Sequence, residues 1–264
     1  MIDTHTHLYI ADSFPDGGET AVKRAIDGGI DRMVLPAIDI ESVAPLLSLH
    51  EKFPGHTAVA MGLHPTEVEA DWRDELREIL DRSSDEEIVA IGETGLDLYW
   101  EQRYLSRQMD AFGEQLQIAA ERDLPVIVHN RDAFKETIEL LNSFGSGLPQ
   151  LVFHSFTAGK EEMESLLEAA PGCYFGINGV VTFKNAAPLR EAIESMPAER
   201  IVTETDSPFL APVPFRGKTN ESAYIPYIVQ TIAKVKNVDE ETVRHITVEN
   251  ACRLFPRMAP PPQE

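Results

Sequence analysis

The chain has 264 residues, 43% of them hydrophobic and 25% charged, which is the composition of a globular protein rather than of a disordered or fibrous one. Its 44 acidic and 23 basic side chains give a net charge of −21, which argues against tight nonspecific binding to nucleic acid over most of the surface. The length suits a single domain, which we expect over residues 1–258, followed by a Pro-rich, disordered tail over residues 259–264.

The sequence contains no apolar run of the roughly 18 residues that a membrane-spanning helix needs, and its start lacks the pattern of a signal peptide. We therefore expect a cytoplasmic protein that does not associate with membranes. Cys173 and Cys252 lie far apart and outside any CxxC spacing, so we expect two reduced, buried thiols. Since the sequence points to no stable protein partner, we also expect a monomer.

Short runs rich in Val and Ile alternate with amphipathic stretches along the whole chain. The runs that predict strands are Ile2 to His5, Arg32 to Pro36, Thr57 to Leu63, Ile88 to Glu93, Pro125 to His129, Leu151 to His154, Cys173 to Ile177 and Ile201 to Thr205. The clearest helical stretch covers residues 101–125, where apolar side chains recur at steps of three and four, at Leu105, Met109, Phe112, Leu116 and Ala119.

A further helix is predicted over residues 239–255, with Val243, Ile246, Ala251 and Leu254 on its inner stripe. No GxGxxG or Walker-type glycine loop follows any predicted strand. Eight strand–helix units in about 250 residues therefore predict an α/β fold of the (β/α)8 TIM-barrel type rather than a doubly wound sheet.

Histidines and carboxylates gather at the predicted strand ends. In "IDTHTHL", His5 and His7 share one face because alternate residues of a strand point the same way. Four more donors stand at the carboxyl ends of the fourth, fifth, sixth and eighth strands: Glu93, His129, His154 and Asp206. Barrels of this type build their active sites at that end, so the pattern predicts one metal site.

Six donors exceed the needs of one tetrahedral ion and suggest two divalent cations, Zn, Mn, Ni or Mg, which the sequence does not distinguish. We expect His5, His7 and Asp206 at the first cation, His129 and His154 at the second, and Glu93 between them. Asp206 then becomes the natural proton acceptor for an attacking water.

Two further residues lie close to these donors in sequence. Glu204 shares a face with Asp206, and we expect it to orient a water or a ligand histidine. His64, at the end of the third strand, either donates a hydrogen bond to a phosphate oxygen or supports the site, although a structural histidine explains it nearly as well.

The segments "IDTHTHL", "GLHP", "GETGLD", "LPVIVHNRDA", "FHSFTA", "GVVTFKNA" and "ETDSPFLAP", in this order, resemble the TatD family of metal-dependent hydrolases along nearly the whole chain. The resemblance implies a TIM barrel, a divalent-metal site and hydrolysis of phosphodiester bonds in DNA, typically as a nuclease that trims 3′ ends. The metal ligands it implies are His5, His7, Glu93, His129, His154 and Asp206. Thr94, Leu98 and Trp100 depart from the family pattern, and with the acidic net charge they leave the substrate preference open.

Basic residues occur in the loops expected at the barrel mouth, and we expect four of them to contact substrate phosphates: Arg131, Lys184, Arg216 and Lys218. Alternatively, Arg131 pairs with a neighbouring carboxylate and Lys184 is simply solvated. The aromatic residues Tyr99, Trp100 and Phe209 either stack on an unpaired base or pack at the rim. Because an acidic body offers no long basic groove, we expect exonuclease action on single-stranded 3′ ends of DNA.

Two other functions remain open. The same ligands suit hydrolysis of a carboxyl ester, a lactone or an aminoacyl-tRNA bond, in which case loss of Arg216 and Lys218 would matter less than in a nuclease. A non-catalytic metal-binding scaffold would bind metal stoichiometrically but would show no activity that depends on Asp206.

Overall fold

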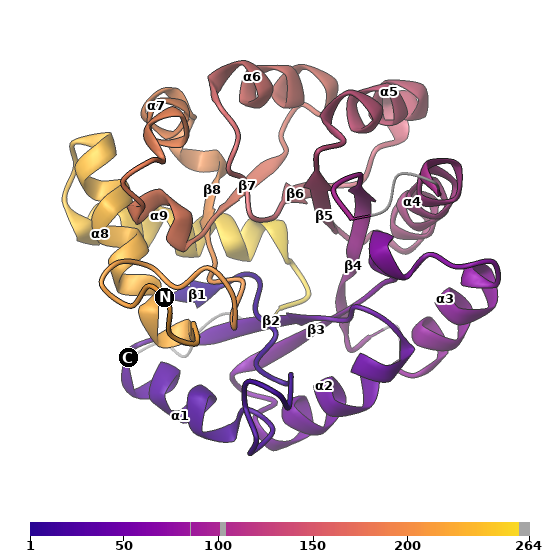
Figure 1. Cartoon of the computed structure of the whole chain (residues 1–264), viewed down its shortest axis with the longest axis horizontal. Coiled ribbons are helices and arrows are strands. Elements are labelled where there is room, and N and C mark those ends of the chain that lie inside the picture. Colours follow the sequence, from indigo (N-terminus) through magenta and orange to yellow (C-terminus); the bar gives the residue numbers. More distant parts are fainter. Residues whose placement is uncertain (85, 101–103, 259–264) are drawn as a thin grey trace.

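The computed structural model describes residues 1–84, 86–100 and 104–258. Eight parallel strands form one sheet in chain order, and helices surround it (Figure 1). The strands are β1 (Ile2–Asp3), β2 (Arg32–Pro36), β3 (Thr57–Met61), β4 (Ile88–Asp97), β5 (Val126–Arg131), β6 (Leu151–Phe153), β7 (Tyr174–Ile177) and β8 (Ile201–Thr203). The first and last strands meet, because the N–H of Thr4 donates to the carbonyl oxygen of Thr203 (3.0 Å) and Thr6 bridges Ser207. The predicted (β/α)8 barrel is therefore confirmed.

Helices follow the strands around the outside of the barrel. They are α1 (Glu19–Asp27), α2 (Ile40–Lys52), α3 (Trp72–Asp81), α4 (Leu105–Arg122), α5 (Phe134–Phe144), α6 (Lys160–Ala169), α7 (Ala187–Ser195), α8 (Ile225–Lys236) and α9 (Glu240–Leu254). Short 3-10 turns lie between them: η1 (Pro65–Glu67), η2 (Gly145–Gly147), η3 (Gly179–Thr182), η4 (Ala198–Arg200) and η5 (Ser222–Tyr224). Among the described residues, these helices include none with both the length and the apolar character of a membrane span. The expected tail, residues 259–264, lies outside the described residues.

The interior of the barrel is apolar at its amino-terminal end. Inward-facing side chains such as Val34, Ile127 and Val202 pack there against Phe255 and Met258, which follow α9. Burial of a side chain as large as Phe255 contributes about 1.5–3 kcal/mol to folding. Since the interior of the barrel is filled at this end, its open space lies toward the carboxyl-terminal ends of the strands.

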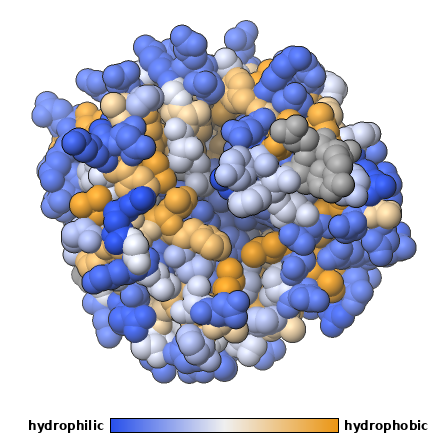
Figure 2. Space-filling view, in the orientation of Figure 1, coloured by the Kyte–Doolittle hydropathy of each residue, from blue (hydrophilic) through white to orange (hydrophobic). Residues whose placement is uncertain are grey.

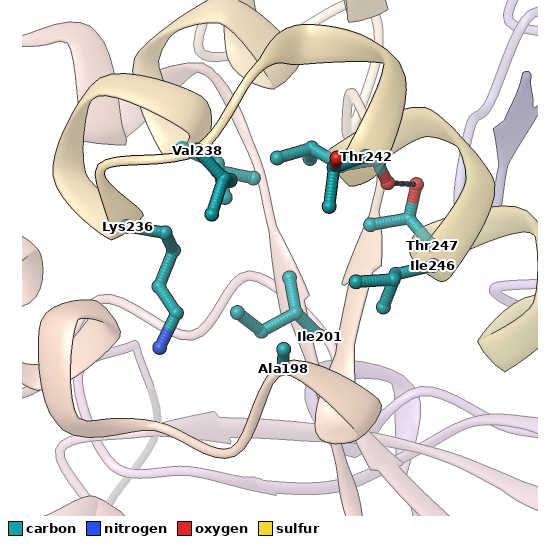
Figure 3. A pocket seen from close by; sticks show the side chains of 9 residues that line it. Ala198, Ile201, Lys236, Val238, Thr242, Ile246 and Thr247 are labelled. Carbon is teal, nitrogen blue, oxygen red and sulfur yellow. Dashed lines mark hydrogen bonds between the residues drawn. The ribbon is translucent and has the colours of Figure 1, made fainter.

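Three of the four residues predicted for the inner stripe of α9 are buried, namely Val243, Ala251 and Leu254. Ile246 is instead half-buried, and it borders a small apolar pocket of about 50 Å³ between α8 and α9 (Figure 3). The helical pattern is therefore confirmed, but Ile246 borders a gap that α8 does not fill.

Several strand ends differ from their predicted positions. β1 stops at Asp3, so His5 and His7 follow the strand in a segment that hydrogen bonds to both neighbours: Thr6 donates to Val34 and His7 to Ser207. β4 runs past its predicted end at Glu93 to Asp97. The pairing of β4 with β5 shifts register between Ile91 and Thr94, which alternation of side chains cannot reveal.

Two buried glutamines of α4, which the apolar stripe predicted from the sequence did not include, tie this helix to the site loops. Gln108 accepts a hydrogen bond from the N–H of Asp97 (2.9 Å) and donates to its carbonyl oxygen (3.1 Å). Gln115 binds the backbone of Leu63 in the same way, at 2.9 and 3.2 Å. The backbone before His64 and the end of β4 are therefore anchored to one helix.

Candidate metal centre

A cavity of about 490 Å³ lies at the carboxyl ends of the strands, and Figure 2 shows a hollow near the middle of the molecule with hydrophobic residues on part of its rim. Its lining includes six of the residues singled out above: His7, His64, Glu93, His129, His154 and Asp206. His5 is fully buried beside them. Residues on or directly after six different strands therefore bring these donors to one place.

Glu93 occupies the centre of the cluster. One carboxylate oxygen, Oε2, lies 3.2 Å from Nε2 of His5 and 3.5 Å from Nε2 of His7. The other, Oε1, lies 2.9 Å from Nδ1 of His129 and 2.8 Å from Nε2 of His154. Each oxygen thus faces one pair of imidazoles, as a carboxylate between two cations would.

Asp206 lies at the open side of the first imidazole pair. Its Oδ1 is 3.8 Å from Nε2 of both His5 and His7, and one ligand atom from each of these three residues fits within a 4.8 Å cluster. A second such group joins His5, Glu93 and His154. A third joins His64, Glu93 and His129. The first group has the three residues expected at the first cation, whereas the pairing of His129 with His154 at a second cation stays a prediction.

A buried hydroxyl orients His7. The Tyr9 hydroxyl donates to the carbonyl oxygen of Pro36 (2.5 Å), so its oxygen can only accept from Nδ1–H of His7 (2.9 Å). His7 Nε2 is then left with a free lone pair directed at His5 and Glu93. The sequence analysis missed Tyr9, although it stands two residues after His7 in the same alternating segment.

A carboxylate orients His129. Oδ2 of Asp97 accepts from Nε2–H of His129 (3.0 Å), and Nδ1 of the same ring faces Oε1 of Glu93 (2.9 Å). Although burial alone would lower the pKa of His129, its hydrogen bonds to Asp97 and Glu93 hold that pKa above its usual value. Asp97 was also missed, although it ends the quoted "GETGLD" segment.

Glu204 lies behind His154. Its Oε1 accepts from the N–H of Ser155 (2.5 Å) and lies 3.6 Å from Nδ1 of His154. Although burial alone would lower the pKa of His154, the carboxylates of Glu93 and Glu204 hold that pKa well above its usual value. Glu204 thus lies behind one histidine of the cluster, and its role in orienting that histidine stays a prediction.

His64 differs from the other histidines of the cluster in the direction of its protons. A backbone N–H can only donate, and the N–H of Thr66 lies 3.2 Å from Nδ1 of His64, so Nδ1 accepts. Burial lowers the pKa of His64, which favours a neutral ring with its single proton on Nε2. That Nε2–H points toward Oε1 of Glu93 at 3.4 Å, so His64 is oriented as a hydrogen-bond donor rather than as a ligand.

The carboxylates of the cluster have opposite pKa shifts. Burial alone would raise the pKa of Glu93, but the surrounding imidazoles, first His154 and then His5, hold it well below its usual value. Burial raises the pKa of Asp206 to about 6, against the opposing effect of His154. Glu93 therefore provides a buried negative charge, while Asp206 is the more basic carboxylate.

The donor set fits divalent cations. Nε2 of His5 and Nε2 of His7 face each other at 3.0 Å, where a shared positive ion would satisfy both lone pairs. Imidazole and carboxylate donors without thiolate suit Zn, Mn, Ni or Mg.

The four expected substrate contacts lie in different places. Arg131 lines the cavity, where its guanidinium packs 3.9 Å from the ring centroid of Tyr99. Lys184, Arg216 and Lys218 do not line it. Arg216 instead packs over the ring of Phe183 (3.8 Å) and Lys218 over that of Phe215 (5.8 Å).

The amino-acid sequence is similar to that of known proteins along almost its whole length. Residues 2–256 match the family model described as TatD related DNase. A Bacillus subtilis protein named as the uncharacterized metal-dependent hydrolase YabD is 35% identical over 255 residues, which cover 97% of this chain and 98% of that protein. The protein named 3′-5′ ssDNA/RNA exonuclease TatD from Erwinia billingiae is 34% identical over 261 residues, with 97% and 98% covered.

Solved structures show the same architecture. The TatD homologue YJJV from Escherichia coli K12 superposes with a TM-score of 0.87 at 27% identity and covers 97% of this chain and 98% of its own. A hydrolase of the TatD family from Entamoeba histolytica, at 20% identity, shares the fold with a TM-score of 0.84 over 97% of each chain. With a family model that matches nearly every residue and relatives above 30% identity, the chain belongs to the TatD family.

Proposed function

We propose that the chain is a divalent-metal-dependent hydrolase that cleaves phosphodiester bonds in DNA, as an exonuclease acting on single-stranded 3′ ends. The observation that carries the proposal is the donor cluster around Glu93, which lies in a cavity whose lining also includes Arg131 and the aromatic rings of Trp100 and Phe209. The name of the Erwinia relative, a 3′-5′ ssDNA/RNA exonuclease, supports the same substrate class.

Two cations are proposed, one held by His5, His7 and Asp206 and the other by His129 and His154, with Glu93 shared between them. Such cations supply Lewis acidity, which activates water and polarises the phosphoryl group. The hydrogen bonds of Tyr9 and Asp97 place one ring proton on the outer nitrogen of His7 and of His129, so that the other nitrogen of each ring could hold a cation.

Asp206 is proposed to take the proton from the attacking water. Its carboxylate lines the cavity, and burial raises its pKa to about 6, close to the pH at which it must accept a proton. Glu93 is less suited to this role because the imidazoles around it hold its pKa well below the usual value.

His64 and Arg131 are proposed to hold the reacting phosphate. Both line the cavity. The Nε2–H of His64 is directed into the cluster, and the guanidinium of Arg131 packs on Tyr99, which limits its freedom to move. Together they supply hydrogen bonds to the phosphoryl oxygens from outside the ligand set.

The rim suits an unpaired terminus. The side chains of Trp100 and Phe209 are 67% and 55% exposed although both line the cavity, so their ring faces can stack on bases. Each stacked base contributes about 1–3 kcal/mol without sequence preference. A paired end keeps its bases inside the duplex, so this mode of binding favours single strands.

The test is hydrolysis of an oligonucleotide that carries a different fluorophore at each end, with Mg²⁺, Mn²⁺ or Zn²⁺ supplied separately. We expect mononucleotides to leave the 3′ end first, from single-stranded DNA faster than from duplex, with RNA run in parallel. The Glu93→Gln variant, which removes one charge from the centre of the cluster, is expected to be inactive.

Internal fragments that appear first would contradict exonuclease action. Hydrolysis of p-nitrophenyl esters or lactones with no release of nucleotides would replace the proposal with a carboxyl-ester or lactone hydrolase. Stoichiometric metal binding without turnover of any substrate would favour the scaffold.

A further inference from the structure

A second hollow, of about 590 Å³, lies between η3 and α8. Its lining includes the basic residues Lys184, Arg190 and Lys234 and the aromatic residue Tyr227, but no acidic side chain of the described residues. In a chain of 44 acidic and 23 basic residues, a hollow whose charged lining residues are all basic is unusual. We refer to it as the lysine groove.

The lysines of the chain fall into two groups by their partners. In the part of the chain that the structure describes, four of the eight lysines pair with a glutamate at 4.0 Å or less, namely Lys23, Lys52, Lys135 and Lys160, whereas Lys184, Lys218, Lys234 and Lys236 do not. Within the described residues, Lys184 and Lys234 have no carboxylate at such a distance, and Lys234 contacts only the neutral amide of Gln230 (3.2 Å). Two exposed ammonium groups therefore remain available to an anion in this groove.

The guanidinium of Arg190 supports one wall of the groove, and its hydrogen bonds to the backbone leave it less available to a ligand. Its guanidinium donates to the carbonyl oxygens of Val181 (3.0 Å) and Phe183 (2.7 Å). These bonds hold the segment after η3 that presents Lys184. Lys184 is thus carried on an ordered wall of the groove.

Aromatic faces stand beside these charges. Tyr227 is 38% exposed in the groove, and behind it the rings of Phe215 and Tyr224 stack at 4.1 Å between centroids. Phe215 meets the ring of Tyr227 edge-on at 5.1 Å. Positive charge that follows a backbone, combined with rings on which bases stack, is the usual composition of single-strand binding sites.

One short segment, residues 210–213, contributes to the lining of both the metal cavity and the groove, and we call this segment the ridge. Leu210 lines the cavity and Val213 lines the groove. These residues are three positions apart, so their Cα atoms are separated by no more than about 11 Å. The N–H of Val213 donates to Oγ1 of Thr182 (2.9 Å), which fixes the ridge against η3. A strand whose end lies in the cavity can cross this ridge within a few nucleotides.

We propose that the lysine groove binds the sugar–phosphate backbone of the nucleotides next to the reacting end of a single strand, with Lys184 and Lys234 on successive phosphates and Tyr227 under a base. The inference rests on the proposed nuclease function, because the groove is treated as a continuation of the substrate path. It predicts that a long strand binds more tightly than a short one that fills only the metal cavity.

The test compares the double variant Lys184→Gln/Lys234→Gln with wild type and with a matched control, Lys135→Gln/Lys160→Gln, which loses the same charge from two lysines paired with glutamates. The probes are fluorescent oligothymidylates of about 12 and about 3 nucleotides, made with phosphorothioate linkages that resist hydrolysis but keep their charge. Anisotropy titrations over a series of salt concentrations give the dissociation constant and its salt dependence.

We expect the double variant to bind the longer probe about tenfold more weakly than wild type, since two exposed charge contacts are lost. The slope of log affinity against log salt should fall by about 0.7 for each lost phosphate contact, or about 1.4 in all. The advantage of the long probe over the short one should shrink in this variant and persist in the control.

Three results would overturn the inference while the nuclease proposal stood. One is that the double variant binds the longer probe with the affinity and salt dependence of wild type, while wild type still trims oligonucleotides. Another is an equal loss in the control, which would indicate a general effect of charge. The third is a molecular mass on gel filtration that differs between the double variant and wild type, which would mark the groove as a contact between copies of the chain. If wild type itself neither binds nor trims oligonucleotides, the proposed function fails first.

Discussion

Asp97 and His129 form a hydrogen bond of 3.0 Å between Oδ2 and Nε2, on the side of the imidazole that faces away from Glu93. Oδ1 of the same carboxylate accepts from the N–H groups of Tyr99 (2.9 Å) and Trp100 (3.0 Å). Asp97 therefore sets the tautomer of one proposed ligand and also fixes the start of the loop that carries the exposed tryptophan.

Asp97→Asn should weaken metal binding while leaving the barrel folded. An amide can still accept from Tyr99 and Trp100, but its NH₂ group faces Nε2 of His129 and moves the ring proton to Nδ1, the nitrogen directed at Glu93. We expect metal affinity to fall about 10–100-fold, measured by competition with a chromophoric chelator. Asp123→Asn makes the same change at an exposed helix end, and an equal loss there would remove the assigned role of Asp97.

Asp206→Asn should lower kcat by about 10²–10⁴ in steady-state hydrolysis of single-stranded DNA, because the proposed proton acceptor is lost. Asp206 and Asp132 both have positive φ angles, of 56° and 54°, which Asn tolerates well. Asp132→Asn is therefore the matched control, with activity near that of wild type. Unchanged turnover in Asp206→Asn would mean that another group accepts the proton.

Removal of divalent metal should abolish hydrolysis and lower the thermal unfolding midpoint. A cation that binds the folded chain alone adds about 2.7 kcal/mol of stability when present at about 100 times its dissociation constant. Calorimetric scans with EDTA, and then with Mn²⁺ or Zn²⁺ restored, measure this shift. Glu93→Gln should show a much smaller one, and a shift equal to that of wild type would place the cation elsewhere.

Gly176→Ala should disturb the site through Glu204. A Cβ atom at Gly176 would lie 1.9 Å from Oε2 of Glu204, so the carboxylate must leave its place beside His154. We expect a loss of metal affinity, measured by chelator competition, together with a lower thermal unfolding midpoint, measured by calorimetry. Gly55→Ala meets no atom within 4 Å and serves as the control, with stability unchanged or slightly raised.

Cys173 should not react with Ellman's reagent in the folded protein. Its side chain is 1% exposed, and burial raises the pKa of its thiol to about 12. At about pH 8 only about one molecule in ten thousand would carry the reactive thiolate. Cys252→Ser leaves Cys173 as the single thiol, which should appear only after denaturation. Rapid reaction of the native variant would show that helix α6 opens around it.

The barrel was predictable because its pattern is local. Each strand needs a short apolar run, as in Arg32–Pro36, and each helix needs an apolar stripe, as at Phe112 and Leu116. The proposed ligands were predictable for a related reason, since parallel strands around a barrel bring their carboxyl ends to one rim. His129 and His154 are 25 residues apart in sequence, yet their ring nitrogens lie 3.3 Å apart.

Sequence pattern alone therefore determined the fold, the end of the barrel that carries the cluster and the set of proposed ligands. Only the tertiary structure decided which nitrogen of the His7, His129 and His64 rings faces the cluster, because that depends on hydrogen bonds with Tyr9, Asp97 and Thr66. The alternation of side chains along a strand does not encode the direction of these bonds. The lysine groove is likewise a tertiary feature. Lys184 and Lys234 are 50 positions apart, and they border one hollow because a closed barrel places the loop after β7 beside the helix that follows β8.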